Sequence, residues 1–144
     1  MIEHPFIGLA GNIGVGKTTF TEKIAVALNW TPIYESVSNN PYLNDFYTDM
    51  NRWSFNLQIY FLQKRFEAQR DILSSKVGIV QDRTIYEDSE IFAKNLNQMG
   101  QLKDRDFKTY NDLFNIMTSY LRKPDLIIYL KASTDTLLTR IHLR

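Results

Sequence analysis

The chain has 144 residues, of which 44% are hydrophobic and 23% are charged; its formal net charge is +1 and it contains no cysteine. These values are typical of one soluble globular domain with a core of its own. They argue against a nucleic-acid polymer as partner, and they exclude a disulfide framework and a thiolate metal site. The N-terminus does not resemble a signal peptide and the longest apolar run, LIIYL, is too short for a membrane span. We therefore expect a cytoplasmic protein.

Short apolar runs typical of buried strands alternate with helical periodicity along the chain. The expected strands are 6–10, 31–35, 77–81 and 124–132. The expected helices are 16–29, 50–73, 87–96 and 104–121, and a further helix begins at the capping residues 133–135. This alternation predicts an α/β fold with an open parallel sheet covered by helices on both faces. Ligands of such sheets bind beyond the carboxyl ends of the strands, where Glu35, Asp82 and Arg83 are expected.

The segment GNIGVGKT, residues 11–18, matches the phosphate-loop pattern G-x-x-x-x-G-K-S/T and lies between an expected strand and an expected helix. Its glycines let backbone N–H groups turn toward a phosphate, and the helix N-terminus adds partial positive charge. Lys17 is expected to reach the β- and γ-phosphates, and the Thr18 hydroxyl to bind Mg²⁺. The motif predicts a P-loop NTPase-type site, the alternative being a glycine-rich turn without ligand. The residues expected to bind the nucleotide here are Gly11, Asn12, Ile13, Gly14, Val15, Gly16, Lys17, Thr18 and Thr19.

Three charged residues follow two of the expected strands. Asp82 ends a strand that should lie beside the loop strand, which is the usual place for a carboxylate that holds Mg²⁺. Arg83 follows it and can donate two parallel hydrogen bonds to phosphate oxygens. Glu35 ends the second strand and is the best-placed acceptor for the proton of an alcohol that becomes phosphorylated. The alternatives are a surface pair for Asp82 and Arg83, and a capping or exposed acid for Glu35.

A stripe of polar and aromatic residues follows the long helix at helical spacing: Gln58, Phe61 with Leu62, Arg65 and Gln69. Amides and a guanidinium interleaved with aromatic rings suit a nucleobase, which offers flat faces and polar edges. Periodicity alone slightly favours a solvated helix edge instead.

These motifs resemble the deoxynucleoside kinase family, and within it the bacterial deoxyadenosine/deoxyguanosine kinases. The resemblance runs through AGNIGVGKTT, YESVSNNPYLNDFY, RWSFNLQIYFLQKR, QDRTIYEDSEIFAKNL, PDLIIYLKAS and RIHLR, and so covers essentially the whole chain. It implies that Glu35 is the general base, that Asp82 and Arg83 are the family's acid–arginine pair, and that Tyr47 binds the sugar 3′-hydroxyl. It also implies that the base is read by Gln58, Arg65 and Asp88 and stacked upon by Phe92. The residues expected to bind the nucleoside are Glu35, Val37, Tyr47, Gln58, Phe61, Arg65, Arg83, Asp88 and Phe92.

The chain departs from the family pattern in two places. Many members have Glu-Pro-Val where this chain has Glu35-Ser36-Val37, a difference that bears on the rigidity of the loop. The family's lid reads R-x-x-x-R-x-R, of which this chain has Arg140 and Arg144, both expected at the nucleotide. We therefore expect residues 1–144 to form a single P-loop deoxynucleoside kinase domain that is C-terminally incomplete, lacking a strand and the lid.

The sequence thus predicts a salvage kinase that moves the γ-phosphoryl of ATP to the 5′-hydroxyl of a purine deoxynucleoside, with deoxyadenosine first. Lys17, Glu35 and Arg83 are the expected catalytic residues, Thr18 and Asp82 the expected Mg²⁺ ligands. The resemblance also implies a homodimer through helices 87–96 and 104–121. The alternatives are a thymidylate or other nucleoside monophosphate kinase, which needs basic residues that 34–42 lacks, a nucleotide-binding switch, and an inactive ATP-binding remnant.

Overall fold

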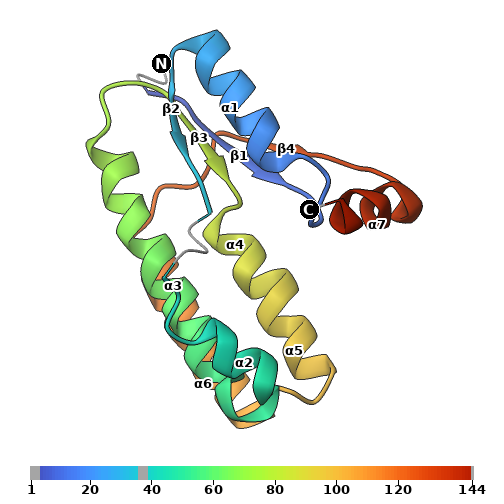
Figure 1. The fold of residues 1–144 in the computed structure, drawn as a ribbon. Coiled ribbons are helices and arrows are strands. Elements are labelled where there is room, and N and C mark those ends of the chain that lie inside the picture. Colours follow the sequence, from blue (N-terminus) through green and yellow to red (C-terminus); the bar gives the residue numbers. More distant parts are fainter. Residues whose placement is uncertain (1–3, 36–38, 144) are drawn as a thin grey trace. The chain divides into compact units, whose positions relative to one another are not determined.

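The computed structural model describes residues 4–35 and 39–143, whose helices and strands are drawn in Figure 1. In chain order they are β1 (Phe6–Ala10), α1 (Lys17–Leu28), β2 (Thr31–Ile33), α2 (Leu43–Thr48), α3 (Met50–Ser74), β3 (Ile79–Asp82), α4 (Ile85–Glu87), the π-helix η1 (Asp88–Ala93), α5 (Lys94–Gln98), α6 (Asp104–Thr118), β4 (Leu126–Tyr129) and α7 (Thr134–His142). They belong to two compact units. The first consists of residues 1–35, 71–84 and 123–144, and the second of residues 36–70 and 85–122.

The first unit contains a four-stranded sheet in the order β2-β3-β1-β4, with every neighbouring pair parallel. The predicted open parallel sheet is therefore confirmed. Leu9 pairs with Asp82, and Ile33 pairs with Gln81. The carboxyl ends of β1, β2 and β3 consequently meet at one edge of the sheet, where the phosphate loop leaves β1.

Each face of this sheet has a small apolar core. On one face Leu9 and Val80 pack with Ala25 of α1, which Figure 1 shows lying along the strands. On the other face Phe6 and Ile79 pack with Ile72 from the last turn of α3. The two sets alternate along β1 and β3 as the strand period of two requires. Helical residues thus cover both faces, as the alternation of elements predicts.

The second unit is helical and has a larger core of its own. Leu62 of α3, Ile85, Ala93, Leu102 and the α6 residues Tyr110 and Phe114 form one buried cluster. Aromatic rings add to it, since Tyr110 and Phe114 stack at 6.4 Å between ring centroids. This core fixes α3, η1 and α6 within the unit and with them the polar side chains described below.

The element boundaries differ from the sequence expectations in several places. The expected strand 124–132 is shortened to β4, Leu126–Tyr129. The second strand ends at Ile33, two residues before Glu35. The expected helix 87–96 is divided into α4, η1 and α5. The short helix α2 (Leu43–Thr48) was not expected. The Ser133 cap is confirmed, because its hydroxyl accepts the Thr136 N–H at 3.2 Å. Within the described residues, no helix combines the length and apolarity that crossing a membrane requires.

Candidate functional site

The phosphate loop joins β1 to α1 and turns through three glycines with positive φ, namely Gly11 (149°), Gly14 (82°) and Gly16 (101°). L side chains rarely adopt this region, so Gly16 can serve as the N-cap of α1 where other residues would be strained. Gly16 has no side chain that could cap the first N–H groups of α1, and the first turn of this helix has no acidic residue. The helix therefore presents its positive end to the loop, as an anion site requires.

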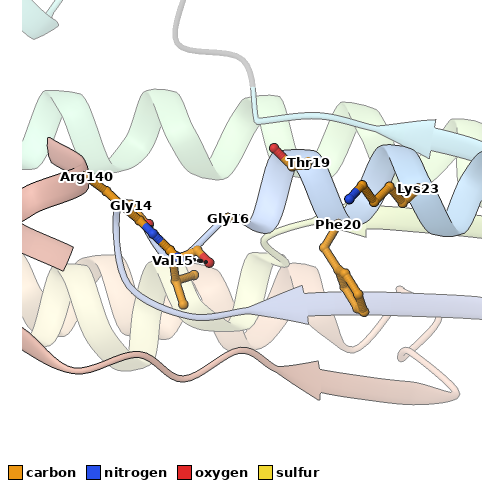
Figure 2. A pocket seen from close by; sticks show the side chains of 7 residues that line it. All are labelled: Gly14, Val15, Gly16, Thr19, Phe20, Lys23 and Arg140. Atoms are coloured by element: carbon orange, nitrogen blue, oxygen red, sulfur yellow. Dashed lines mark hydrogen bonds between the residues drawn. The ribbon is translucent and has the colours of Figure 1, made fainter. Parts of the chain in front are cut away.

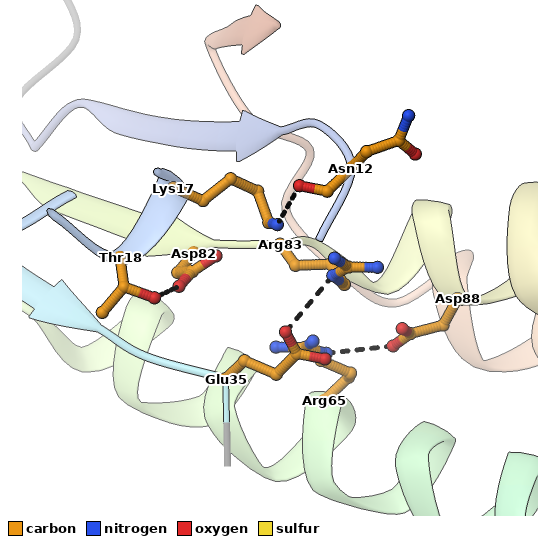
Figure 3. A network of polar contacts seen from close by, with 8 residues as sticks. All are labelled: Asn12, Lys17, Thr18, Glu35, Arg65, Asp82, Arg83 and Asp88. Atoms are coloured by element: carbon orange, nitrogen blue, oxygen red, sulfur yellow. Dashed lines mark hydrogen bonds and ion pairs between the residues drawn. The ribbon is translucent and has the colours of Figure 1, made fainter. Parts of the chain in front are cut away.

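Lys17 folds back into this loop. Its ammonium donates a hydrogen bond to the Asn12 carbonyl oxygen at 3.4 Å, and only 7% of the residue is exposed (Figure 3). The charge is therefore held where the loop closes on itself. A phosphate seated in the loop would meet this ammonium as well as the N–H groups of the backbone.

Thr18 and Asp82 come together at the ends of α1 and β3. The Thr18 hydroxyl donates to Asp82 Oδ2 at 2.7 Å (Figure 3), and Asp82 is buried. The expectation that Asp82 ends a strand beside the loop strand is confirmed by its pairing with Leu9 of β1. The result is a pair of hard oxygen atoms at the entrance to the first turn of α1.

Glu35 and Arg83 also meet within the first unit. Arg83 Nε lies 3.4 Å from Glu35 Oε2; the arginine side chain is buried and the carboxylate is partly exposed. Arg83 has φ of 66°, a left-handed backbone that is uncommon outside glycine. Its own N–H donates to the Leu9 carbonyl at 3.0 Å, so the turn is held against the loop strand. The left-handed turn sets the direction in which the guanidinium leaves β3.

In the second unit the polar stripe on α3 is buried. Gln58, Arg65 and Gln69 are 3%, 6% and 1% exposed, so the alternative of a solvated helix edge is wrong. Gln58 Oε1 has no hydrogen-bond partner within residues 4–35 and 39–143. A buried amide oxygen without a partner is costly, and a ligand that donates a hydrogen bond to it would remove that cost.

Gln58, Arg65 and Asp88 form a buried polar group in the second unit, and Arg65 makes the contact between two of its members. Its Nε donates to Asp88 Oδ2 at 2.9 Å, and both side chains are buried (Figure 3). Asp88 is the first residue of η1, and π-helical turns are frequent at functional sites. Burial, together with the negative charge of Asp88, raises the pKa of Tyr110. The Asp88 charge therefore acts through a poorly solvated interior, where polar contacts are strong.

The remaining predicted residues lie in varied surroundings. Phe61 and Phe92 are partly buried, whereas Tyr47 on α2 is 69% exposed. Val37 and Arg144 fall outside the described residues.

A hollow of about 410 Å³ lies on the outer side of the phosphate loop, and Figure 2 shows the side chains around it. Thr19 and Arg140, which the sequence predicts to bind the nucleotide, are among the residues that line it. Phe20 and Lys23 of α1 line it too, although neither is among the residues predicted from the sequence. The spacing of Lys23, four residues after Thr19, is the signal that could have found it, because such residues share a helix face.

Comparisons with known proteins show which protein family the chain belongs to. A family model described as deoxynucleoside kinase matches residues 7–144. A deoxyadenosine/deoxycytidine kinase of Bacillus subtilis is 46% identical over 144 residues, which cover 99% of this chain and 66% of that protein. The chain belongs to the deoxynucleoside kinase family. The family resemblance of its motifs is thereby confirmed.

Further relatives agree with this assignment. A deoxyadenosine kinase of Dictyostelium discoideum is 48% identical over 143 residues, covering 99% of this chain and 58% of that protein. A solved structure of deoxyadenosine kinase from M. mycoides with bound dATP superposes with a TM-score of 0.85 at 33% identity, over 98% of this chain and 72% of that one. This deoxynucleoside kinase chain thus spans less than two thirds of the length of the two curated relatives.

The left-handed backbone of Arg83 leads to a stability prediction. Arg83→Ala and Arg83→Gly both remove the ion pair with Glu35, but only glycine also relieves the strain at φ of 66°. The strain costs an ordinary residue about 1–2 kcal/mol, and glycine loses about 0.5–1 kcal/mol more than alanine through backbone entropy. We expect Arg83→Gly to be the more stable by about 0.5–1 kcal/mol in urea denaturation. An alanine variant as stable as the glycine variant would contradict a strained turn.

Proposed function

We propose that the protein is an ATP-dependent kinase that phosphorylates the 5′-hydroxyl of a purine deoxynucleoside, with deoxyadenosine as the expected acceptor, and that residues 1–144 act as one kinase domain. The observation that carries the proposal is the Glu35–Arg83 ion pair at the strand edge from which the phosphate loop leaves. A switch that only binds nucleotide needs the loop but no such carboxylate–guanidinium pair. The named activities of the relatives support deoxyadenosine.

The proposed donor site consists of the phosphate loop and Lys17. The negative charge of a donor phosphate at the N-terminus of α1 would be balanced by the N–H groups of the loop and by the Lys17 ammonium. Oxygen ligands suit Mg²⁺, which usually takes one or two protein groups and keeps water and phosphate as its other ligands. Thr18 and Asp82 offer two such oxygens, and the described residues contain no cluster of three or more His, Cys, Asp or Glu that would hold a metal by itself. Mg²⁺ held there would neutralise charge on the β- and γ-phosphates.

The proposed transfer uses Glu35 and Arg83. Glu35 accepts the proton of the 5′-hydroxyl as its oxygen attacks the γ-phosphorus, and the bond from that phosphorus to the β-γ bridging oxygen breaks. Arg83 neutralises charge on the transferred group. Their 3.4 Å contact orients both side chains before a substrate binds, so little reorientation is needed when it does.

The proposed acceptor site consists of the buried polar group of the second unit. The Gln58 amide offers one acceptor and donors side by side, which matches the N6 amino group and a ring nitrogen of adenine. The Arg65–Asp88 pair offers a second donor–acceptor set, held rigid by its 2.9 Å contact. We propose that Phe92 stacks on the base, that Phe61 and Val37 contact the nucleoside, and that Tyr47 binds the 3′-hydroxyl. These contacts would reject analogues that lack the matching polar groups.

Nucleoside-dependent release of ADP tests the proposed activity. We expect the protein to release ADP from ATP·Mg²⁺ when deoxyadenosine is added, more slowly with deoxyguanosine or deoxycytidine, and hardly at all without acceptor. Glu35→Gln should lower kcat by about 100-fold or more, because proton transfer loses its base. Glu67→Gln, which changes an acid in a surface ion pair with Lys64, is the matched control and should leave kcat unchanged. ADP release that ignores every nucleoside would refute the kinase and favour a switch.

Base recognition gives a prediction in which binding and stability change differently. Gln58→Leu removes a buried amide whose oxygen has no partner within the described residues. We expect the variant to be at least as stable as the wild type in urea denaturation, because an unsatisfied polar group is replaced by an apolar one of similar size. The KM for deoxyadenosine should rise about tenfold or more while the KM for ATP is unchanged. Gln63→Leu, on the exposed side of α3, is the control. An unchanged deoxyadenosine KM would exclude Gln58 from the base site.

We also propose that the protein is a homodimer whose interface includes α6. Leu113 and Ile116 of α6, and Tyr120 in the turn just after it, are spaced three and four residues apart and are exposed. We expect light scattering to give the mass of two chains, and Ile116→Glu to give the mass of one without loss of folded structure, since a charge in an apolar interface is unfavourable. A wild-type mass of one chain would contradict the proposal.

A further inference from the structure

The helix α7 contacts the phosphate loop from its outer side. Arg140 Nη1 donates to the carbonyl oxygens of Gly14 at 3.3 Å and Val15 at 3.1 Å, across 126 and 125 positions of the sequence. Figure 2 shows the guanidinium reaching these two residues at the rim of the hollow. The contact joins the last turn of α7 to the middle of the loop.

Close packing accompanies these hydrogen bonds. Gly14 has φ of 82°, and a Cβ added to it would lie 3.3 Å from both the Leu137 carbonyl oxygen and Ile141 Cγ1 of α7. A side chain at this position would be crowded by the helix as well as strained by the positive φ, so glycine suits this close approach. The contact is therefore made by backbone and side chains together, and Arg140 is its polar part.

Peptide geometry links this outer contact to the inner side of the loop. In a trans peptide the C=O and N–H groups point in opposite directions. Arg140 holds the Val15 carbonyl outward, so the N–H of Gly16, which shares that peptide, points the other way. The Val15 N–H, which shares a peptide with the Gly14 carbonyl, donates to the Asn12 carbonyl at 3.2 Å and closes the loop turn. A cation on both carbonyls also strengthens the N–H groups as donors, because hydrogen bonds in a chain polarise one another.

We propose that Arg140 is a positioning residue for the donor site: it fixes the peptides of Val15 and Gly16 from outside and acts on bound phosphate through the loop. The proposal rests on the loop's proposed role as phosphate site. It assigns Arg140 a route different from the direct nucleotide contact that the family resemblance implies. A direct contact changes only the bound state, whereas an anchor also changes the loop before any ligand binds.

The test compares Arg140→Met, which keeps the aliphatic stem and removes the donors, with Arg140→Lys, which retains a charged donor. Amide hydrogen exchange of Val15 is measured by NMR on the ligand-free protein. Binding of Mg·ATP and of Mg·tripolyphosphate is measured by calorimetry. Arg105→Met, which removes an exposed arginine from α6, is the control.

We expect Arg140→Met to accelerate Val15 exchange about tenfold and to weaken both ligands by the same factor of about ten, with Arg140→Lys between it and the wild type. Arg105→Met should change neither. Weaker binding with unchanged Val15 exchange, or weaker ATP binding with unchanged tripolyphosphate binding, would overturn the anchor in favour of direct contact. If Arg140→Met fails to fold, Arg140→Lys decides the comparison instead. We expect it to weaken the binding of Mg·ATP and of Mg·tripolyphosphate by the same factor, of about three or less. Unequal factors would overturn the anchor.

These readouts do not depend on phosphoryl transfer. A protein that binds tripolyphosphate but releases no ADP with any nucleoside would refute the proposed kinase and leave the anchor open to confirmation. A wild-type protein that binds neither Mg·ATP nor Mg·tripolyphosphate would refute the loop as a phosphate site, and the anchor with it.

Discussion

The parallel pairing of β1 with β3 is the constraint on which the rest of the first unit depends. It places Asp82 opposite Leu9 and thereby sets the Thr18 hydroxyl 2.7 Å from a carboxylate 64 positions away. The pairing can carry Thr84 against β1 because Gly8 has no Cβ; an added one would lie 2.5 Å from Thr84 Cγ2. The strand that feeds the loop therefore also positions the acid beside it, and the site forms as the sheet forms.

The second unit places charge where stability alone would not. Arg65 and Asp88 are buried in the unit whose core holds Leu62 and Tyr110. Replacing a buried ion pair by apolar residues is often neutral or stabilising, while breaking it is costly, so such a pair is weak support for stability. The unpartnered oxygen of Gln58 adds a further cost within the described part of the chain. The proposed recognition of a polar base edge would give these three side chains a common purpose that packing does not.

The sequence predicts the sheet and its edge better than it predicts backbone detail. Glu35, Asp82 and Arg83 could be placed because strand ends of a parallel sheet meet at one edge. The burial of Gln58 and Gln69 could not, because a polar stripe has the same periodicity whether it faces solvent or a polar interior. The left-handed turn at Arg83 and the π-helix from Asp88 could not either. Both depend on tertiary contacts, since local propensity disfavours a positive φ at arginine and a π turn almost anywhere.

The ion pair of Glu35 and Arg83 lies where the chain leaves the first unit. That unit ends once at Glu35 and again at Thr84, directly after Arg83. The ion pair therefore fixes the distance between these two segment ends by a contact that lies wholly within the first unit. Because each unit has its own apolar core, their free energies of local opening need not be equal. Residues that would have to keep a set geometry during the proposed transfer are best held by the sheet, and the left-handed turn of Arg83 against Leu9 holds this pair to the sheet through the backbone itself.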